Sequence, residues 1–227
     1  MSEIKQFKHF KDVFETKSRG MTIILTKNLV PGKTVYEEDT FKSGDVEYRA
    51  WDPKRSKLGA ALLKDVSQIG MKENDYVLYL GCSTGTTVSH VSDIVGKNGL
   101  VYALDFAPRV MRDMVFVAED RGNIAPILAD ANKPEEYAHL VSVVDCVFMD
   151  IAQKQQAEIF IKNCRMFLKS GGFGLLALKA RSMDVTRNPK DVFKQVRDQL
   201  EKEFIVADYR ELAPFEMDHA MFVVKKR

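Results

Sequence analysis

The chain has 227 residues, 45% of them hydrophobic and 29% charged, which suits one globular domain, or one with a small appendage, and excludes a mainly disordered protein. With 34 basic against 32 acidic residues, the formal charge is only +2, so the chain alone lacks the charge to hold nucleic acid tightly at physiological salt. Its three cysteines, at positions 82, 146 and 164, are odd in number and include no C-x-x-C pair, which argues against a disulfide framework or a zinc site.

Short β-prone runs separated by turn signals fill the part of the chain before Trp51. The turn signals contain Gly20, Gly32 and Gly44. The runs cover residues 7–14, 21–26, 34–37 and 46–51. Strands at such close spacing pair most simply with their neighbours in sequence. We therefore expect a small, mostly antiparallel β-rich domain over residues 1–52.

Apolar runs of strand length alternate with helical patterns in the rest of the chain. The runs end at Leu80, Leu104, Ala129, Met149 and Leu178. The helical patterns cover residues 56–69, 86–95, 108–121, 134–140, 152–168 and 189–204. Because parallel strands need crossover helices, this alternation predicts an α/β domain with a doubly wound, mostly parallel sheet over residues 53–227. Two final runs, 204–212 and 220–226, are joined by a short loop and predict one antiparallel strand at the sheet edge.

A glycine loop follows the first run of this second domain. Gly81 and Gly85 allow a tight turn into a helix whose amide-rich end favours an anion. Ser83 and Thr86 break the G-x-G-x-x-G fingerprint of dinucleotide-binding proteins, so an NAD oxidoreductase is disfavoured. A plain strand-to-helix turn explains a G-x-x-x-G loop about equally well.

Three successive runs each end in an aspartate: Asp105, Asp130 and Asp150. Carboxyl ends of parallel strands meet at one edge of a sheet, which is where such folds bind ligands. Asp105 follows the loop at the spacing of a ribose-binding acid, and Asp130 is placed to accept from an adenine amino group. Each acid alone is explained as a solvated strand end, but together with the loop they favour a nucleoside-bearing ligand.

Five stretches of the sequence resemble the fibrillarin family, the class I S-adenosylmethionine-dependent RNA 2′-O-methyltransferases of box C/D ribonucleoproteins. They are residues 51–61, 79–90, 101–109, 149–153 and 218–224. The resemblance implies a Rossmann-like, seven-stranded methyltransferase sheet. The chain opens directly into strand-like sequence and not into the Gly/Arg-rich leader of the eukaryotic members, so it resembles an archaeal form, and a cytoplasmic location is expected.

The resemblance also implies a cofactor, S-adenosylmethionine, and the residues that bind it. These are Gly81, Gly85, Thr86, Thr87, Asp105, Phe106, Asp130, Ala131, Asp150, Ile151, Ala152 and Gln153. Amides near Thr86 and Thr87 would bind the methionyl carboxylate, and Phe106 would pack on the adenine face. No metal is expected.

Four positions match the catalytic set of RNA 2′-O-methyltransferases: Lys57, Asp150, Lys179 and His219. A ribose hydroxyl is a poor nucleophile at neutral pH, so the site must align it and help to remove its proton. We expect Lys179 to accept that proton at a pKa lowered by burial and neighbouring cations, Asp150 to orient Lys179, and Lys57 and His219 to position the ribose. Without the resemblance, a lysine at a strand end is usually a solvated charge and a half-buried histidine is usually structural.

Basic side chains gather near the expected site: Lys54, Arg55, Lys57, Lys179, Arg181, Arg187 and Lys190. They could engage phosphates, but the low net charge indicates that target choice is delegated. The resemblance implies partners that would do so, namely a box C/D guide RNA that selects nucleotides in rRNA and possibly tRNA, a Nop-type scaffold protein and, through it, a kink-turn-binding ribosomal-type protein. No membrane partner is expected. The alternatives are a methyltransferase of the same fold that acts on a protein side chain or a small molecule, and a non-catalytic subunit.

Overall fold

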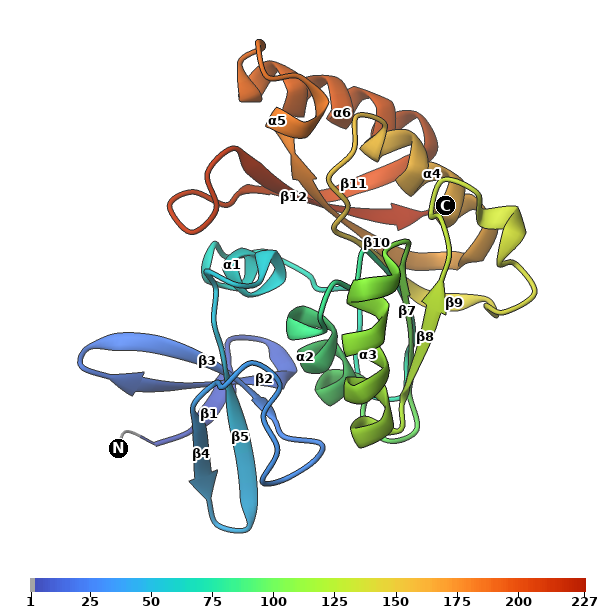
Figure 1. Ribbon diagram of the computed structural model, residues 1–227. Coiled ribbons are helices and arrows are strands. Elements are labelled where there is room, and N and C mark those ends of the chain that lie inside the picture. Colours follow the sequence, from blue (N-terminus) through green and yellow to red (C-terminus); the bar gives the residue numbers. More distant parts are fainter. Residues whose placement is uncertain (1–2) are drawn as a thin grey trace.

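The computed structural model describes residues 3–227 and contains two β-sheets, with the first ending at Trp51 (Figure 1). The smaller sheet has the strand order β1-β2-β3-β5-β4, and all its pairs are antiparallel. Its strands are β1 (Lys5–Phe7), β2 (Phe10–Ser18), β3 (Met21–Lys27), β4 (Thr40–Ser43) and β5 (Val46–Trp51).

The prediction of a strand over residues 34–37 is wrong, because that segment is a loop and the edge strand of the small sheet is β4. The Glu38 carboxylate accepts hydrogen bonds from the amides of Val35 and Tyr36 at 2.8–3.1 Å. A side chain therefore satisfies the main-chain donors that a neighbouring strand would otherwise have to satisfy.

The larger sheet has the strand order β11-β12-β10-β9-β6-β7-β8. Its strands are β6 (Tyr76–Leu80), β7 (Leu100–Asp105), β8 (Ile124–Leu128), β9 (Val144–Met149), β10 (Leu168–Lys179), β11 (Phe204–Glu211) and β12 (His219–Lys226). The pairs from β8 to β10 are parallel, so the expected doubly wound, mostly parallel sheet is confirmed.

The antiparallel strand is β12, which lies between β10 and β11 and not at the edge as predicted. Residues 219–224 of β12 are all buried, whereas β11 keeps exposed positions such as Ile205. A strand that is buried along most of its length is best accommodated between two neighbours, and the more polar strand then takes the edge.

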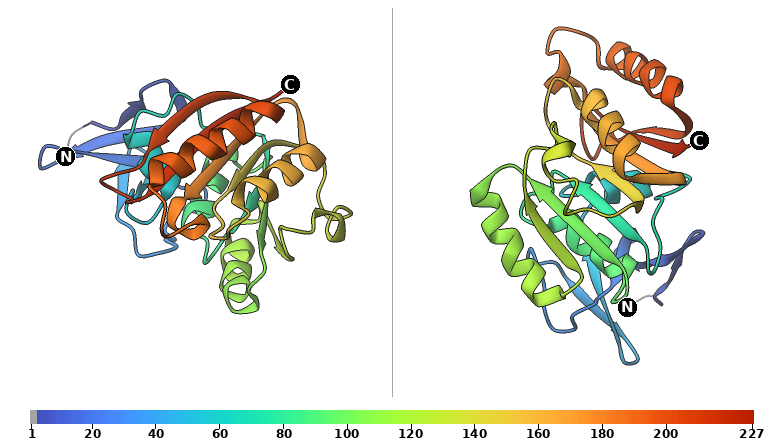
Figure 2. Two further views of the ribbon diagram at one scale, coloured as in Figure 1. Left: turned by 90° about the horizontal axis from the view of Figure 1, so that it is seen from above. Right: turned by 90° about the vertical axis from the view of Figure 1, so that its right-hand side faces the viewer.

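In the described part of the chain, six α-helices surround the larger sheet: α1 (Lys57–Leu63), α2 (Thr86–Val95), α3 (Pro108–Arg121), α4 (Gln156–Phe167), α5 (Ala180–Met183) and α6 (Pro189–Glu203). One apolar cluster joins α1, α2 and α3 to one face, and a second joins α4 and α6 to the other. Successive residues of β6 alternate between them, with Val77 and Tyr79 in the first cluster and Leu78 and Leu80 in the second. Figure 2 shows α4 (gold) next to α6 (orange), and both helices pack on the β10–β12 end of the sheet.

Three predicted helices are shorter than expected. The first stops at Leu63, because the chain turns at Asp65, whose φ is +60° and whose carbonyl accepts from Arg210 of β11 at 3.0 Å. The predicted helix 134–140 is one 3₁₀ turn, Pro134–Glu136, followed by Tyr137, which is buried. The third, predicted from residue 152, begins at Gln156. Among residues 3–227, no helix has the length and hydropathy to cross a membrane.

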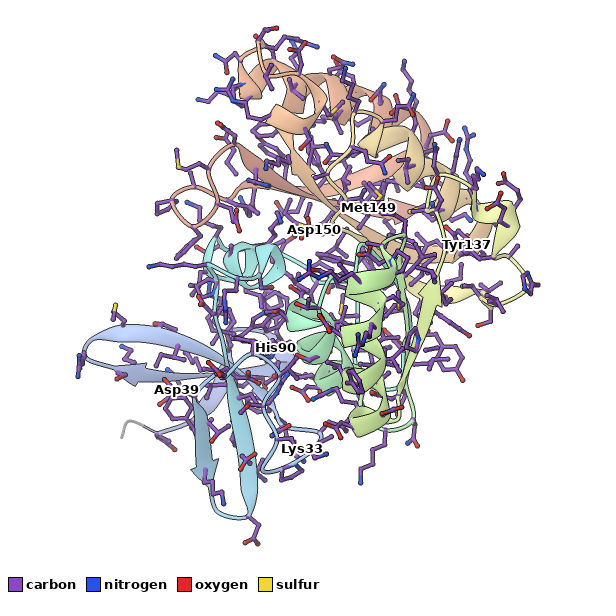
Figure 3. The ribbon with its side chains drawn as sticks, viewed as in Figure 1. Lys33, Asp39, His90, Tyr137, Met149 and Asp150 are labelled. Atoms are coloured by element: carbon purple, nitrogen blue, oxygen red, sulfur yellow. The ribbon has the colours of Figure 1, made fainter. Side chains whose placement is uncertain are left out.

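A buried polar network joins the small sheet to α2. Arg49 of β5 is fully buried and forms ion pairs with Glu38 and with Asp93 of α2. His90 of α2 is also fully buried, and its ring stacks on Trp51 at 4.6 Å. Figure 3 shows His90 where α2 meets the small sheet. The charged residues in this contact are thus paired and hydrogen-bonded, as burial requires.

Candidate active site

The glycine loop brings three strand ends together. Gly81 has a φ of +84°, and a Cβ there would collide with the carbonyl group of Asp150, so no other residue fits without a shift. The amides of Gly81 and Cys82 both donate to Leu104 O, at 2.8 and 3.0 Å. Gly85, at φ +95°, then caps α2. The ends of β6, β7 and β9 therefore lie against one another.

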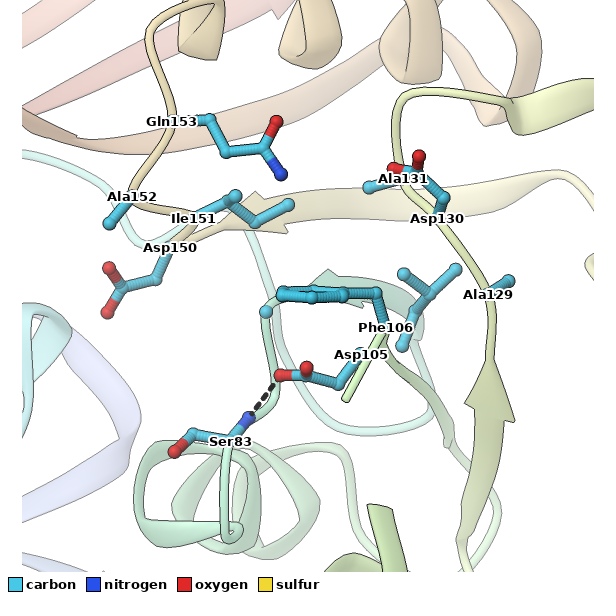
Figure 4. A pocket seen from close by; sticks show the side chains of 12 residues that line it. Ser83, Asp105, Phe106, Ala129, Asp130, Ala131, Asp150, Ile151, Ala152 and Gln153 are labelled. Carbon is cyan, nitrogen blue, oxygen red and sulfur yellow. Dashed lines mark hydrogen bonds between the residues drawn. The ribbon is translucent and has the colours of Figure 1, made fainter. Parts of the chain in front are cut away.

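Three carboxylates line one pocket at this edge. They belong to Asp105, Asp130 and Asp150, which follow or end β7, β8 and β9 (Figure 4). The two Asp105 oxygens each accept a main-chain amide at 3.1 Å, from Ser83 and from Ala107. The carboxylate of Asp105 is therefore held in place by the protein itself.

Phe106 and the main chain around Asp130 supply the other features of the pocket. The Phe106 side chain belongs to the lining and is 66% exposed, which is unusual for an aromatic residue. Asp130 Oδ1 accepts from the Asn132 amide at 2.9 Å, and Asn163 of α4 donates to Ala131 O at 2.8 Å. An uncovered aromatic face beside fixed carboxylates suits a purine nucleoside.

The pocket includes all but three of the predicted cofactor residues, together with three that sequence reasoning missed. The predicted residues in the lining are Gly81, Asp105, Phe106, Asp130, Ala131, Asp150, Ile151, Ala152 and Gln153. The missed residues are Ser83, Leu104 and Ala129. The sequence did contain a signal for them, because Ser83 belongs to the glycine loop and the other two each precede a strand-end aspartate.

Gly85, Thr86 and Thr87 lie at the start of α2, outside the pocket lining. The Thr87 hydroxyl points into the protein, where it donates to Ser56 Oγ at 3.0 Å. Contact between the amides at this helix end and a methionyl carboxylate stays a prediction.

Asp150 forms an ion pair with Lys57, at 2.9 Å between Oδ2 and Nζ. Both side chains are about one-fifth exposed, at 24% and 20%. In Figure 4 the Asp150 carboxylate is directed away from Asp105 and Asp130. The expectation that Asp150 orients Lys179 is therefore wrong in this structure, because α1 packs its first residue against the end of β9.

Lys179 ends β10 and is exposed, so the expectation that it is buried is also wrong. Among the described residues, its ammonium forms no hydrogen bond or ion pair. Lys179 is paired in register with His219 of β12. Residues directly opposite in an antiparallel pair project from the same face, so these two side chains are neighbours.

His219 is 7% exposed and holds one defined tautomer. Its Nδ1 lies 2.7 Å from Met217 O, and since a carbonyl only accepts, Nδ1 carries the proton. Burial lowers the pKa of His219, and the nearby Lys57 ammonium lowers it further, against the opposing effects of the Met217 carbonyl, Glu216 and Asp150. The imidazole is therefore neutral at pH 7, with Nε2 free to accept a hydrogen bond.

Cys82, in the glycine loop, does not act as a thiolate here. Burial and the Asp105 charge raise the pKa of its thiol to about 12. A protonated, 3% exposed thiol is a poor nucleophile, so Cys82 is not a candidate for covalent catalysis.

The family model described as Fibrillarin matches residues 4–227. The fibrillarin-like rRNA/tRNA 2′-O-methyltransferase of Methanocaldococcus jannaschii is 49% identical over 225 residues, which is 98% of this chain and 97% of that protein. A crystal structure of Aeropyrum pernix fibrillarin with natively bound S-adenosyl-L-methionine is 46% identical, has a TM-score of 0.90, and matches over 99% of this chain and 100% of its own. A fibrillarin/Nop5p complex is 37% identical, with a TM-score of 0.84 over 90% of this chain and 94% of its own.

Proposed function

The chain belongs to the fibrillarin family, and we propose that its pocket and the Lys57–Asp150 pair together form the active site for ribose methylation. The protein is an S-adenosylmethionine-dependent RNA 2′-O-methyltransferase. It acts on nucleotides of rRNA and tRNA as the catalytic subunit of a box C/D ribonucleoprotein. The observation that carries the assignment of the site is the position of Asp150, which lines the nucleoside pocket and holds Lys57.

The donor set suits S-adenosylmethionine. Asp105 offers a fixed carboxylate to the ribose hydroxyls, Phe106 offers an aromatic face to the adenine, and Asp130 accepts at the adenine edge. When bound, this cofactor supplies an electrophilic methyl group on a sulfonium centre. The carboxylates favour such a cation, and Asp150 is the one that also binds Lys57.

The remaining side chains handle the ribose. Asp150 fixes the Lys57 ammonium, which donates to an oxygen of the incoming nucleotide. Neutral His219 accepts a hydrogen bond at Nε2 and so orients the ribose. Lys179 accepts the proton of the 2′-hydroxyl. Because Lys179 is exposed in the free chain, its desolvation would come from the RNA that covers it.

The partners follow from the weak charge of the chain and from its relatives. The chain acts on RNA together with a Nop-type scaffold protein. We propose further that a guide RNA selects the target and that a kink-turn-binding protein completes the assembly in the cytoplasm. The formal charge of +2 supports delegated RNA binding, since salt-resistant binding needs many phosphate contacts.

Reconstitution with a box C/D guide RNA, the scaffold and the kink-turn protein tests this proposal. With methyl-labelled S-adenosylmethionine, we expect the label at one guide-selected ribose. Lys179→Met should lower the transfer rate about 10²–10⁴-fold, the usual contribution of a general base. Lys97→Met, in the turn before β7 at the opposite edge of the sheet, should keep the rate. Label on a base or on protein would overturn the function, whereas an unchanged rate for Lys179→Met would overturn only the role of Lys179.

A further inference from the structure

Gln156, the first residue of α4, binds the main chain of Lys179 through both ends of its side-chain amide. Its Nε2 donates to Lys179 O at 3.1 Å, and its Oε1 accepts from Lys179 N at 3.0 Å. Gln156 is fully buried, so neither bond competes with bulk water. Two hydrogen bonds to one residue fix its peptide groups in position and in rotation.

This contact takes the place of a missing strand. β9 and β10 pair as far as Met149 and Leu176, and beyond Met149 the chain leaves the sheet to line the cofactor pocket. The main-chain groups of Lys179 that face this side form part-buried bonds and would otherwise be unpaired, which costs free energy. The Gln156 amide supplies a donor and an acceptor in the arrangement of a neighbouring strand.

The other side of Lys179 is held by β12. Lys179 lies opposite His219, and the next amide, that of Ala180, donates to Asp218 O at 3.0 Å. The Lys179 main chain is therefore anchored on one side to the strand that carries His219 and on the other to Gln156. The Lys179 ammonium has no partner among the described residues. The position of the Lys179 side chain is therefore set by these main-chain hydrogen bonds.

We infer that Gln156 is a positioning residue, which holds Lys179 in register with the cofactor loop of residues 150–153 so that the amine faces the reacting ribose hydroxyl. The inference rests on the proposed function, because it gives Lys179 a task in methyl transfer. Gln156 lies three residues after the end of the cofactor loop and begins α4. One residue thus couples the cofactor side of the site to the side that removes the proton.

The test compares two buried amides of the same helix. Gln156→Met removes both bonds to Lys179 at nearly constant volume. Asn163→Leu removes the bond to Ala131 O in the cofactor pocket, together with the bonds of the fully buried Asn163 amide to the Tyr137 hydroxyl and to Ile159 O. Each variant is assembled with guide RNA and partner proteins. Single-turnover transfer is measured at saturating S-adenosylmethionine, the Kd of the cofactor by calorimetry, and folding by thermal unfolding.

We expect opposite effects. Gln156→Met should lower the saturated rate about 10²-fold, as a misplacement of about 1 Å can, while the cofactor Kd stays at the wild-type value. Asn163→Leu should raise the cofactor Kd and keep the saturated rate. A purely structural role for Gln156 would not produce this division between rate and Kd.

A wild-type rate for Gln156→Met, or equal losses of rate and cofactor affinity in both variants, would overturn the inference. If Gln156→Met fails to fold, Gln156→Leu replaces it, since its apolar side chain also makes neither bond to Lys179. A wild-type rate for that variant would also overturn the inference. Absence of ribose methylation by the wild-type assembly would instead refute the proposed function, which separates the two failures.

Discussion

The carboxylate of Asp105 is preorganised for ligand binding. The amides of Ser83 and Ala107 fix its two oxygens, so binding does not have to order this side chain. Preorganisation of this kind raises affinity because less conformational freedom is lost on binding. The charge of Asp105 should therefore contribute strongly to cofactor binding.

Replacing Asp105 by Asn should weaken S-adenosylmethionine binding about 10–100-fold. Hydrogen bonds to a charged acceptor contribute about 1.5–3 kcal/mol, and about 1.4 kcal/mol corresponds to a tenfold change in Kd. Calorimetric titration of the isolated chain measures the effect. Asp113→Asn, on an exposed position of α3, is the matched control and should bind normally. Wild-type affinity in Asp105→Asn would remove Asp105 from the ribose contact.

The position of Lys57 depends on how its helix begins. Ser56 caps α1 by accepting from the Gly59 amide at 3.2 Å, and it also receives the Thr87 hydroxyl of α2 at 3.0 Å. Ser56 thereby ties the helix that carries Lys57 to the helix that follows the glycine loop. A seven-residue helix has few other bonds to hold its first turn, so the cap matters more here than in a long helix.

Ser56→Ala should lower the free energy of unfolding by about 1–3 kcal/mol, because it removes both the cap and the buried hydrogen bond from the Thr87 hydroxyl. Methyl transfer in the assembled complex should fall as well, since Lys57 loses its anchor. Asn188→Ala removes the cap of α6, where Asn188 accepts from the Lys190 amide at 3.0 Å, and should cost stability alone. Urea unfolding and transfer assays measure both. Equal activities of the two variants would show that the α1 cap does not position Lys57.

At the scale of the whole molecule, buried ion pairs connect the small sheet to the larger domain. Asp93 of α2 pairs with Arg49 of β5 and with Arg121 of α3, and its Oδ2 lies 4.0 Å from His90 Nδ1. His90 is also hydrogen-bonded to Thr26 and to the Tyr36 hydroxyl, at 2.7 Å each. Breaking a buried ion pair is strongly destabilising, so the two parts of the chain should unfold together.

Burial lowers the pKa of His90 well below its ordinary value, and the charges of Arg49 and Arg121 lower it further. In the unfolded chain the imidazole titrates near pH 6.5. Below that pH the unfolded state binds a proton that the folded state does not, so stability should fall with acidification. The slope approaches about 1.4 kcal/mol per pH unit for this one proton. Above pH 6.5, His90 does not contribute to the change of the unfolding free energy with pH.

Urea unfolding at pH 7.5, 6.5 and 5.5 measures this dependence. His219 has a lowered pKa too and adds to it in the same direction. His90→Gln keeps hydrogen-bonding groups but cannot titrate, so the difference between the two slopes isolates His90. Identical slopes in the wild type and in His90→Gln would contradict the prediction.

Local patterns determined much of the fold. The bounds of α2 and α3 match their predicted residues, because Gly85 and Pro108 mark the helix starts within the sequence itself. The gathering of Asp105, Asp130 and Asp150 at one edge followed from the parallel sheet, since parallel strands present their carboxyl ends together.

The tertiary structure alone decided which side chains pair across the site. Asp150 binds Lys57, which lies 93 residues away, and not the expected Lys179, and Gln156 binds the Lys179 main chain in place of a strand. The position of β12 inside the sheet, between β10 and β11, was likewise decided by the tertiary structure. Periodicity and turn residues act over a few positions of the chain. These contacts depend instead on how helices and strands that are distant in sequence pack on one another, and a local sequence pattern does not contain that information.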